Sequence, residues 1–334
     1  MGKLSTKQLK KLLSCIRKDP RVIVAPTVGF DSGVHLLGNK YVVVSTDPCI
    51  GVPKDWFGWL LIHYAASDVA LFGAKPEFGT INLLGPTSAK ARSFQEIMHL
   101  ACSAAAELGM AIVTGHTGRY ERLSTIVGVC TAYGAIDREK LITPGGAKPG
   151  DRIFCVKPIG LETIVNLSLT QRVLSRRLFG EKRIQELAKL VPMQSCVKEA
   201  LLLASINGVH AMHDATEGGL VAALNEMSAA SNVGFKTEFE KMLVIDGVGL
   251  LKKHFKLSDE QILSMSSTGT ILAAVDPKAE NKVRKALIQR KVEPRIIGVF
   301  STKRGRRILL KSGKAMRFPR KADDPYARIL SGKA

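Results

Sequence analysis

Apolar and polar residues alternate along the chain with periods that predict strands and helices in roughly equal measure. A continuous β-branched run at 41–46 and the apolar segments at 79–86, 110–120 and 124–136 are typical of strands. Residues 28–40 predict two strands separated by a loop, with a hairpin turn at Gly38-Asn39. Helical spacing of apolar residues predicts helices over 5–18, 56–73 and 91–109, the last ending at Gly109.

The second half repeats this mixture of strands and covering helices. Residues 161–206 are largely helical in pattern, and a helix is also expected over 277–292. Further strands are expected at 152–160, near 208–214, before Val275 and at 295–301, with a final hairpin over 305–313. A cluster of glycines and prolines at 143–152 separates the halves. We therefore expect an α+β (mixed α/β) protein with two domains, 1–146 and 147–334.

Composition narrows the class of protein. The net charge of +20 predicts weak, non-specific binding of polyanions. Aromatic residues make up only 6%, and no nucleic-acid-binding module is recognisable. The six cysteines are widely spaced and form no C-x-x-C pair, which favours a reduced, cytoplasmic protein. Residues 56–74 have the length of a membrane span, but His63 and Asp68 within them indicate a buried helix and no membrane partner.

Three aspartates are the first candidate site. Asp47 follows the strand at 41–46, Asp68 lies within a strongly apolar helix, and Asp31 lies in a glycine-flanked loop. A carboxylate in apolar surroundings is costly to bury unless something pairs it, and hard oxygen ligands suit Mg²⁺. The alternatives are a turn aspartate at Asp31, a helix cap at Asp47 and a hydrogen-bonded buried acid at Asp68.

Two glycine-containing motifs are further candidates. Gly115-His116-Thr117-Gly118 predicts a turn at a strand end, where backbone N–H groups could hold an anion or where His116 could simply be exposed. The motif from His213 to Gly219 places Asp214, Thr216 and Glu217 before a glycine pair. A helix N-terminus there would attract an anion, although Asp214 or Thr216 could instead be an ordinary N-cap. The hydroxyl-rich segment 264–270 is a weaker candidate of the same kind.

Standard nucleotide-binding and hydrolase motifs are absent from the sequence: there is no G-x-x-x-x-G-K-[ST], no G-x-G-x-x-G after a strand and no G-x-S-x-G. Taken in order, however, STDP, H-x4-D-x4-GAKP, TGHTG, KPGD with KPIGLE, HDATEGGL and S-x-GT resemble the aminoimidazole ribonucleotide (AIR) synthase, or PurM-like, superfamily. The resemblance covers about residues 21 to 300. Within this superfamily, the chain resembles the AIR synthase-related branch, which includes the hydrogenase-maturation HypE type.

The resemblance implies a fold in which an N-terminal domain pairs with its twin in a homodimer to form a shared β-barrel. A C-terminal α/β sandwich domain would hold the substrate. The resemblance also implies ATP and Mg²⁺ as cofactors, with phosphoryl transfer to an oxygen of a small, anionic substrate. The N-terminal domain, 1–146, would bind ATP and Mg²⁺ and form the dimer.

Individual residues take roles from the same resemblance. Asp31, Asp47 and Asp68 match the metal- and phosphate-binding acids, and His63 matches a histidine of the same helix. The residues implied in cofactor binding are Asp31, Asp47, His63, Gly115, Thr117, Gly218 and Gly219. The residues implied in catalysis are Asp68, His116, Asp214 and Glu217.

The chain departs from the family pattern at two acids. It has a single acid, Asp31, where relatives commonly have a pair, and His116 where many have aspartate. Two alternatives therefore stay beside the HypE-like enzyme: a thiamine-monophosphate kinase-like activity, and a degenerate, non-catalytic nucleotide- or RNA-binding member.

Overall fold

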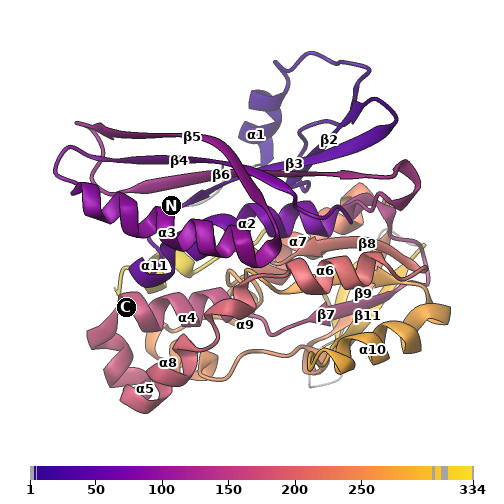
Figure 1. Ribbon diagram of the computed structural model, residues 1–334. Helices are drawn as coiled ribbons and strands as arrows, with labels where there is room; N and C mark the ends of the chain where they lie inside the picture. Colours follow the sequence, from indigo (N-terminus) through magenta and orange to yellow (C-terminus); the bar gives the residue numbers. More distant parts are fainter. Residues whose placement is uncertain (1–3, 5, 303–304, 310–314, 333–334) are drawn as a thin grey trace.

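Two β-sheets with helices packed between them form the protein (Figure 1). The computed structural model describes residues 4, 6–302, 305–309 and 315–332 of the 334-residue chain. The first sheet has six strands and the second has seven. The predicted α+β class with two domains is confirmed.

The six-stranded sheet has the order β1-β2-β3-β6-β4-β5. Its strands are β1 (Val22–Val24), β2 (Ser32–Leu37), β3 (Lys40–Cys49), β4 (Phe78–Pro86), β5 (Ala111–Tyr120) and β6 (Val127–Ile136). β2 and β3 form the predicted hairpin around Gly38, which has φ +60°. β4 and β5 pair in parallel, and every other pair in this sheet is antiparallel.

Two helices cover one face of this sheet (Figure 1). They are α2 (Phe57–Leu71), after the short η1 (Lys54–Trp56), and α3 (Ala91–Leu108), which ends at Gly109 in the left-handed conformation as predicted. α1 (Thr6–Leu13) lies beside the β2–β3 hairpin (Figure 1). Every residue of α2 except Trp59 and Tyr64 is buried. A helix that is apolar on all sides must be covered on all sides, and α2 lies between the six-stranded sheet and α6.

The predicted turn at Gly115–Gly118 is wrong, because these residues lie inside β5. Neither glycine has a positive φ, and β5 stays paired with β4 as far as Tyr120. A Cβ atom on Gly115 would lie 2.2 Å from the carbonyl oxygen of Ile81 in β4. Glycine at this position therefore serves the close approach of two strands and not a turn.

The seven-stranded sheet has the order β13-β12-β9-β11-β7-β10-β8. Its strands are β7 (Arg152–Val156), β8 (Val209–Asp214), β9 (Gly234–Glu238), β10 (Ile271–Val275), β11 (Arg295–Ser301), β12 (Arg306–Leu309) and β13 (Ala315–Arg317). β9 and β12 pair in parallel and the other pairs are antiparallel. β12 and β13 pair as a hairpin, while 310–313 of the predicted hairpin lie outside the described residues.

Both faces of the seven-stranded sheet carry apolar cores. The helices are α4 (Leu161–Thr170), α5 (Arg172–Ala188), α6 (Val197–Ala204), α7 (Gly219–Ala230), α8 (Val248–Phe255), α9 (Asp259–Leu263), α10 (Glu280–Gln289) and α11 (Tyr326–Leu330). Phe154 and Val156 of β7 belong to a core shared with α2, α4 and α6. Ile153 and Cys155, which point to the other face, belong to a core with α7.

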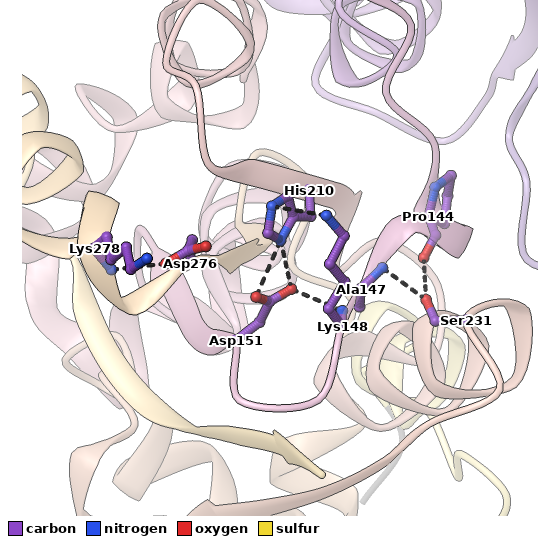
Figure 2. A network of polar contacts seen from close by, with 8 residues as sticks. All are labelled: Pro144, Ala147, Lys148, Asp151, His210, Ser231, Asp276 and Lys278. Atoms are coloured by element: carbon purple, nitrogen blue, oxygen red, sulfur yellow. Dashed lines mark hydrogen bonds and ion pairs between the residues drawn. The ribbon is translucent and has the colours of Figure 1, made fainter. Parts of the chain in front are cut away.

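The segment that joins the sheets is held by polar contacts (Figure 2). It contains η3 (Pro144–Gly146), and the hydroxyl of Ser231 accepts a hydrogen bond from the Ala147 N–H at 3.0 Å. The buried Asp151 carboxylate accepts from the Lys148 N–H at 2.8 Å and from His210 Nδ1 at 2.9 Å. Because the Lys148 ammonium donates to His210 Nε2, the His210 proton lies on Nδ1.

Two further predictions concern the cysteines and the apolar helices. Four of the six cysteines are buried and all six are free, as expected for small apolar residues. Across the described part of the chain, no helix combines the length and apolar character that a membrane crossing requires.

Candidate functional site

Four aspartates from four different elements converge between the two sheets. Asp31 directly precedes β2, Asp47 lies near the end of β3, Asp68 lies in α2, and Asp214 ends β8. The charges of Asp47, Asp214 and Asp31 all act on the Asp68 carboxyl group. The structure therefore brings together the three aspartates predicted from sequence and adds the one from the His213–Gly219 motif.

Asp68 lies at the centre of this group and is 6% exposed. Burial, and then the charges of Asp47, Asp214 and Asp31, raise the pKa of Asp68 well above its ordinary value. One hydrogen bond opposes this, because the Ser45 hydroxyl donates to Asp68 Oδ2 at 2.7 Å. So many acids at one point repel one another unless a bound cation or a proton reduces their negative charge.

His213 supplies part of that positive charge. Its Nε2 donates to Glu226 Oε2 of α7 at 3.0 Å, and its Nδ1 lies 3.6 Å from Asp31 Oδ2 and 3.5 Å from Asp214 Oδ1. Burial on its own lowers the pKa of His213, but the hydrogen bonds to Asp214 and Glu226 and the charge of Asp31 outweigh burial. The net result is a pKa well above the ordinary value, which favours the protonated ring.

The donor atoms fit a hard divalent cation. One ligand atom each from Asp31, His213 and Asp214 lie within 4.8 Å of one another. Carboxylate oxygens are the donors that Mg²⁺ prefers, whereas a protonated imidazole is not a ligand. Asp31 and Asp214 would therefore hold Mg²⁺ together with the neighbouring acids Asp47 and Asp68, while His213 orients two of these carboxylates.

The glycine pair lies beside the acids, but its amides already have partners. Gly218, with φ +81°, is the N-cap of α7, so the N-cap alternative for Asp214 and Thr216 is wrong. The Gly218 N–H donates to Asp324 Oδ2 at 2.9 Å, and the Gly219 N–H donates to the Thr216 carbonyl. Glu217 is exposed, and its charge acts on the buried Glu162.

The same Asp324 carboxylate also accepts hydrogen bonds from the hydroxyl-rich segment 264–270. The Ser266 hydroxyl donates to Asp324 Oδ2 at 2.6 Å, and the Ser266 N–H lies 3.4 Å from Asp324 Oδ1. This segment and the Gly218 turn thus form one anion-binding nest, and an acid of the same chain fills it in this conformation.

His63 lies apart from the acids although it shares α2 with Asp68. Its Nδ1 lies 2.7 Å from the hydroxyl of Ser195, after η4 (Val191–Gln194), and its ring stacks on Trp59 at 3.8 Å. Burial, then the charges of Lys198 and Lys157, lower the pKa of His63 to about 3. The neutral ring thus joins α2 to the second half of the chain and does not reach the aspartates.

The Gly115–Gly118 segment of β5 also lies away from the acids. His116 pairs with Asn82 of β4, whose side chain is on the opposite face of the sheet from the buried Ile81. Asp47 pairs through Cys130 with Ile81, on the face covered by α2. His116, exposed and 2.9 Å from the Tyr120 hydroxyl, therefore faces the uncovered side, and Gly115 and Thr117 form no anion nest.

Sequence reasoning missed Ser45, Glu226 and Glu162. The sequence could have identified Ser45, because residues two apart in a strand share a face and Ser45 precedes Asp47 by two. Glu226 carries no local signal, since only folding places α7 next to His213. Glu162, in the KPIGLE motif, accepts from the Thr268 hydroxyl at 2.5 Å, and burial raises its pKa to about 7.

Comparison with known protein families locates the two halves. The AIR synthase related protein N-terminal domain matches residues 29–136, and the C-terminal domain of the same family matches residues 148–311. Selenide, water dikinase of Haemophilus influenzae (strain Rd) is 30% identical over 69% of this chain, and the matched part spans 64% of that relative. The Escherichia coli (strain K12) selenide, water dikinase is 27% identical over 92% of this chain and 94% of its own length.

Solved structures share the fold. Escherichia coli HypE, a hydrogenase maturation protein, has a TM-score of 0.75 at 24% identity, covering 86% of this chain and 88% of that one. A HypE structure in complex with ATP has a TM-score of 0.73 at 18% identity, covering 98% of this chain and 97% of that one.

Proposed function

Because the chain belongs to the AIR synthase related protein family, we propose that it is a Mg-ATP-dependent, HypE-like enzyme that transfers a phosphoryl group to an oxygen of a small, anionic substrate. The observation that carries the proposal is the convergence of Asp31, Asp47 and Asp214 on the buried Asp68. A HypE structure of the same fold has been solved in complex with ATP, which supports nucleotide use.

The acid cluster is suited to holding metal-bound phosphates. Mg²⁺, when bound, neutralises the charge of the phosphate oxygens during transfer. Asp31, Asp47, Asp68 and Asp214 would hold it, and the imidazolium of His213 would keep Asp31 and Asp214 in place through its contacts at 3.6 and 3.5 Å. The contribution of these side chains is positioning and charge, with no covalent step on the protein.

The division of labour between the halves is part of the same proposal. Residues 1–146 would bind ATP and, together with Asp214 of the second half, Mg²⁺, and residues 147–334 would hold the substrate. The nest formed by Gly218 and Ser266 is suited to an anionic group, and Asp324 would leave it when such a group enters. His116 lies on the uncovered side of the six-stranded sheet and Glu217 is exposed, so neither is placed in the proposed centre.

We further propose a homodimer built on the uncovered face of the six-stranded sheet. Phe78, Val113 and Tyr120 lie on the last two strands with exposed fractions of 42%, 50% and 45%. β5 is an edge strand, and an apolar edge is normally covered by another chain. Light scattering should give twice the chain mass for the protein and the single mass for Val113→Lys. A monomeric wild type would refute the dimer.

The cytoplasm is the proposed compartment, because all six cysteines are free and ATP is the phosphoryl donor.

Turnover tests the enzymatic proposal. ATP consumption and new phosphorus resonances would be followed by ³¹P NMR with Mg²⁺ and either selenide or thiamine monophosphate. Selenide has no oxygen, so product from selenide would place the acceptor on selenium and overturn the assignment to an oxygen. We expect Mg²⁺-dependent product formation that Asp47→Asn abolishes and that the exposed control Asp55→Asn retains. Product from thiamine monophosphate would assign the kinase-like alternative. Mg-ATP binding without turnover of any substrate would identify a non-catalytic member, and absence of binding would refute the proposal.

A further inference from the structure

A row of basic side chains crosses the seven-stranded sheet far from the acid cluster. Strand pairing places Arg152 of β7 opposite Val299 of β11, and Val299 opposite Lys236 of β9. Lys236 in turn pairs with Arg307 of β12, and Arg307 pairs with Arg317 of β13. Paired residues point to the same face of a sheet, so four cations share one face along a line across five strands.

Most of these cations have no internal counter-charge. Arg152 forms an ion pair with Glu280 at 3.3 Å. Over the ranges that the structure describes, by contrast, no carboxylate forms an ion pair with Lys236, Arg307 or Arg317, and all three are exposed. Like charges directly opposite each other on neighbouring strands destabilise a sheet. Three in succession are an arrangement that folding alone disfavours and that a bound anion would relieve.

Arg152, Lys236 and Arg307 of the row line two adjoining hollows in the surface, and Arg317 lies outside both. One hollow has a volume of about 650 Å³, and its lining adds the basic residues Lys241, Arg284 and Arg295 and the acids Glu240 and Glu280. The other has a volume of about 370 Å³ and contains Lys236 and Arg307 in its lining. In the two linings together, six basic residues outnumber three acids, the third being Glu238. Both hollows include Arg152 and Lys241, so they form one continuous basic groove.

The length of the row determines what kind of anion fits. Adjacent strands lie about 4.8 Å apart, so Arg152 and Arg317 are separated by about 19 Å. A single phosphate cannot contact both ends, whereas a linear polyanion can. Phe154 is the aromatic residue in the lining and is fully buried, so the groove offers no surface on which unpaired bases could stack.

From the aligned cations and the adjoining hollows, we propose that the row Arg152, Lys236, Arg307 and Arg317 binds the phosphate backbone of a double-helical nucleic acid. This activity is separate from phosphoryl transfer, because the acid cluster meets β8, at the opposite edge of the sheet from β13. The groove gives a specific location to the polyanion affinity that the net charge of +20 predicts.

Salt-dependent binding of the full-length protein tests the proposal. Fluorescence anisotropy would use a labelled 20-base-pair DNA duplex between 50 and 200 mM salt. Four phosphate contacts predict a slope of about −3.6 for log affinity against log salt, which is a loss of about 100-fold over this range. Substituting Lys236, Arg307 and Arg317 together by Gln should flatten the slope to about −1.

The control variant carries the same charge change elsewhere. Gln substitutions at Lys7, Lys10 and Lys11 of the exposed α1 also lower the net charge by three, and they should keep the wild-type slope. Equal losses in the two variants would overturn the proposal, because net charge alone would then explain binding. If the variant with Gln at Lys236, Arg307 and Arg317 fails to fold, Lys236→Gln alone should make the slope less negative by about 0.9.

Two competitors complete the test. Tripolyphosphate at equal phosphate concentration should not displace the duplex, and efficient displacement would overturn the assignment to a long backbone. A single strand of the same length should bind more weakly, and tighter binding would overturn the assignment to a double helix. Asp68→Asn should bind the duplex as the wild type does, which separates this site from the proposed Mg-ATP centre.

Discussion

Replacing Asp68 by Asn tests whether the acid cluster exists to hold a cation. The substitution keeps the shape of the side chain and its contact with the Ser45 hydroxyl, and it removes a negative charge that Asp31, Asp47 and Asp214 repel. Without a cation, Asp68→Asn should therefore be at least as stable as the wild type. With Mg-ATP present the order should reverse, because the variant has lost a metal-binding carboxylate.

The size of the reversal follows from ligand binding to the folded state. A ligand present at 100 times its dissociation constant stabilises the folded protein by about 2.7 kcal/mol. Unfolding entropy of about 2.1 cal/mol/K per residue gives about 0.7 kcal/mol/K for 334 residues. The wild-type Tm should then rise by about 4 °C on adding Mg-ATP, while the Tm of Asp68→Asn should stay within about 1 °C of its ligand-free value.

Thermal unfolding by differential scanning calorimetry is the assay, with and without Mg-ATP at pH 7.5. Asp151→Asn is the matched control, since Asp151 is also a buried acid but is bound to His210 (Figure 2) and is not among the charges that act on Asp68. It should lower the Tm and still show the full rise with Mg-ATP. An Asp68→Asn protein that shows the wild-type rise would refute the assignment of Asp68 to the cation site.

Four other substitutions test buried contacts and close approaches in the protein. Burial lowers the pKa of His63 to about 3, so its stabilising effect is present above pH 6.5 and is lost as pH falls toward 3. Between pH 8 and pH 5, the unfolding free energy of the wild type should fall by about 2 kcal/mol more than that of His63→Gln. Equal falls in the two proteins would refute a neutral buried ring. Asp151→Ala leaves the His210 Nδ1–H and a backbone N–H without their acceptor and should cost about 2 kcal/mol in urea unfolding; a loss below about 0.5 kcal/mol would contradict the network. Gly219→Ala would place a Cβ atom 2.4 Å from a carbonyl oxygen at φ +53° and should cost about 2 kcal/mol. The helical Gly249→Ala, with open space around it, should stabilise by up to about 1 kcal/mol, and similar effects at both sites would refute the close approach.

Local sequence patterns determined most of the secondary structure, because periodicity and turn chemistry act over a few residues. The β2–β3 hairpin, α2, and α3 with its end at Gly109 lie close to where they were expected. The exception was Gly115–Gly118. Glycine signals both a turn and a close strand approach, and only the pairing with Ile81 of β4 distinguishes the two.

The candidate site was determined partly by sequence and partly by tertiary structure. Costly burial singled out Asp47 and Asp68, the glycine-flanked loop indicated Asp31, and the His213–Gly219 motif indicated Asp214; these four lie close enough for their charges to act on Asp68. The resemblance implied that His63 would bind the cofactor with them, but a helix points residues five apart in different directions, and His63 meets Ser195 instead.

Only the tertiary structure showed which cationic side chain lies at the acid cluster and which carboxylate fills the nest at Gly218. His213 is held protonated by Glu226, thirteen residues away on another element, and the Gly218 nest is filled by Asp324, over a hundred residues away. Such contacts have no local signature, because they depend on how β8, α7 and the C-terminal segment pack together. The sequence by itself therefore identified which acids need a cation, and folding decided which cations and anions of the chain reach them.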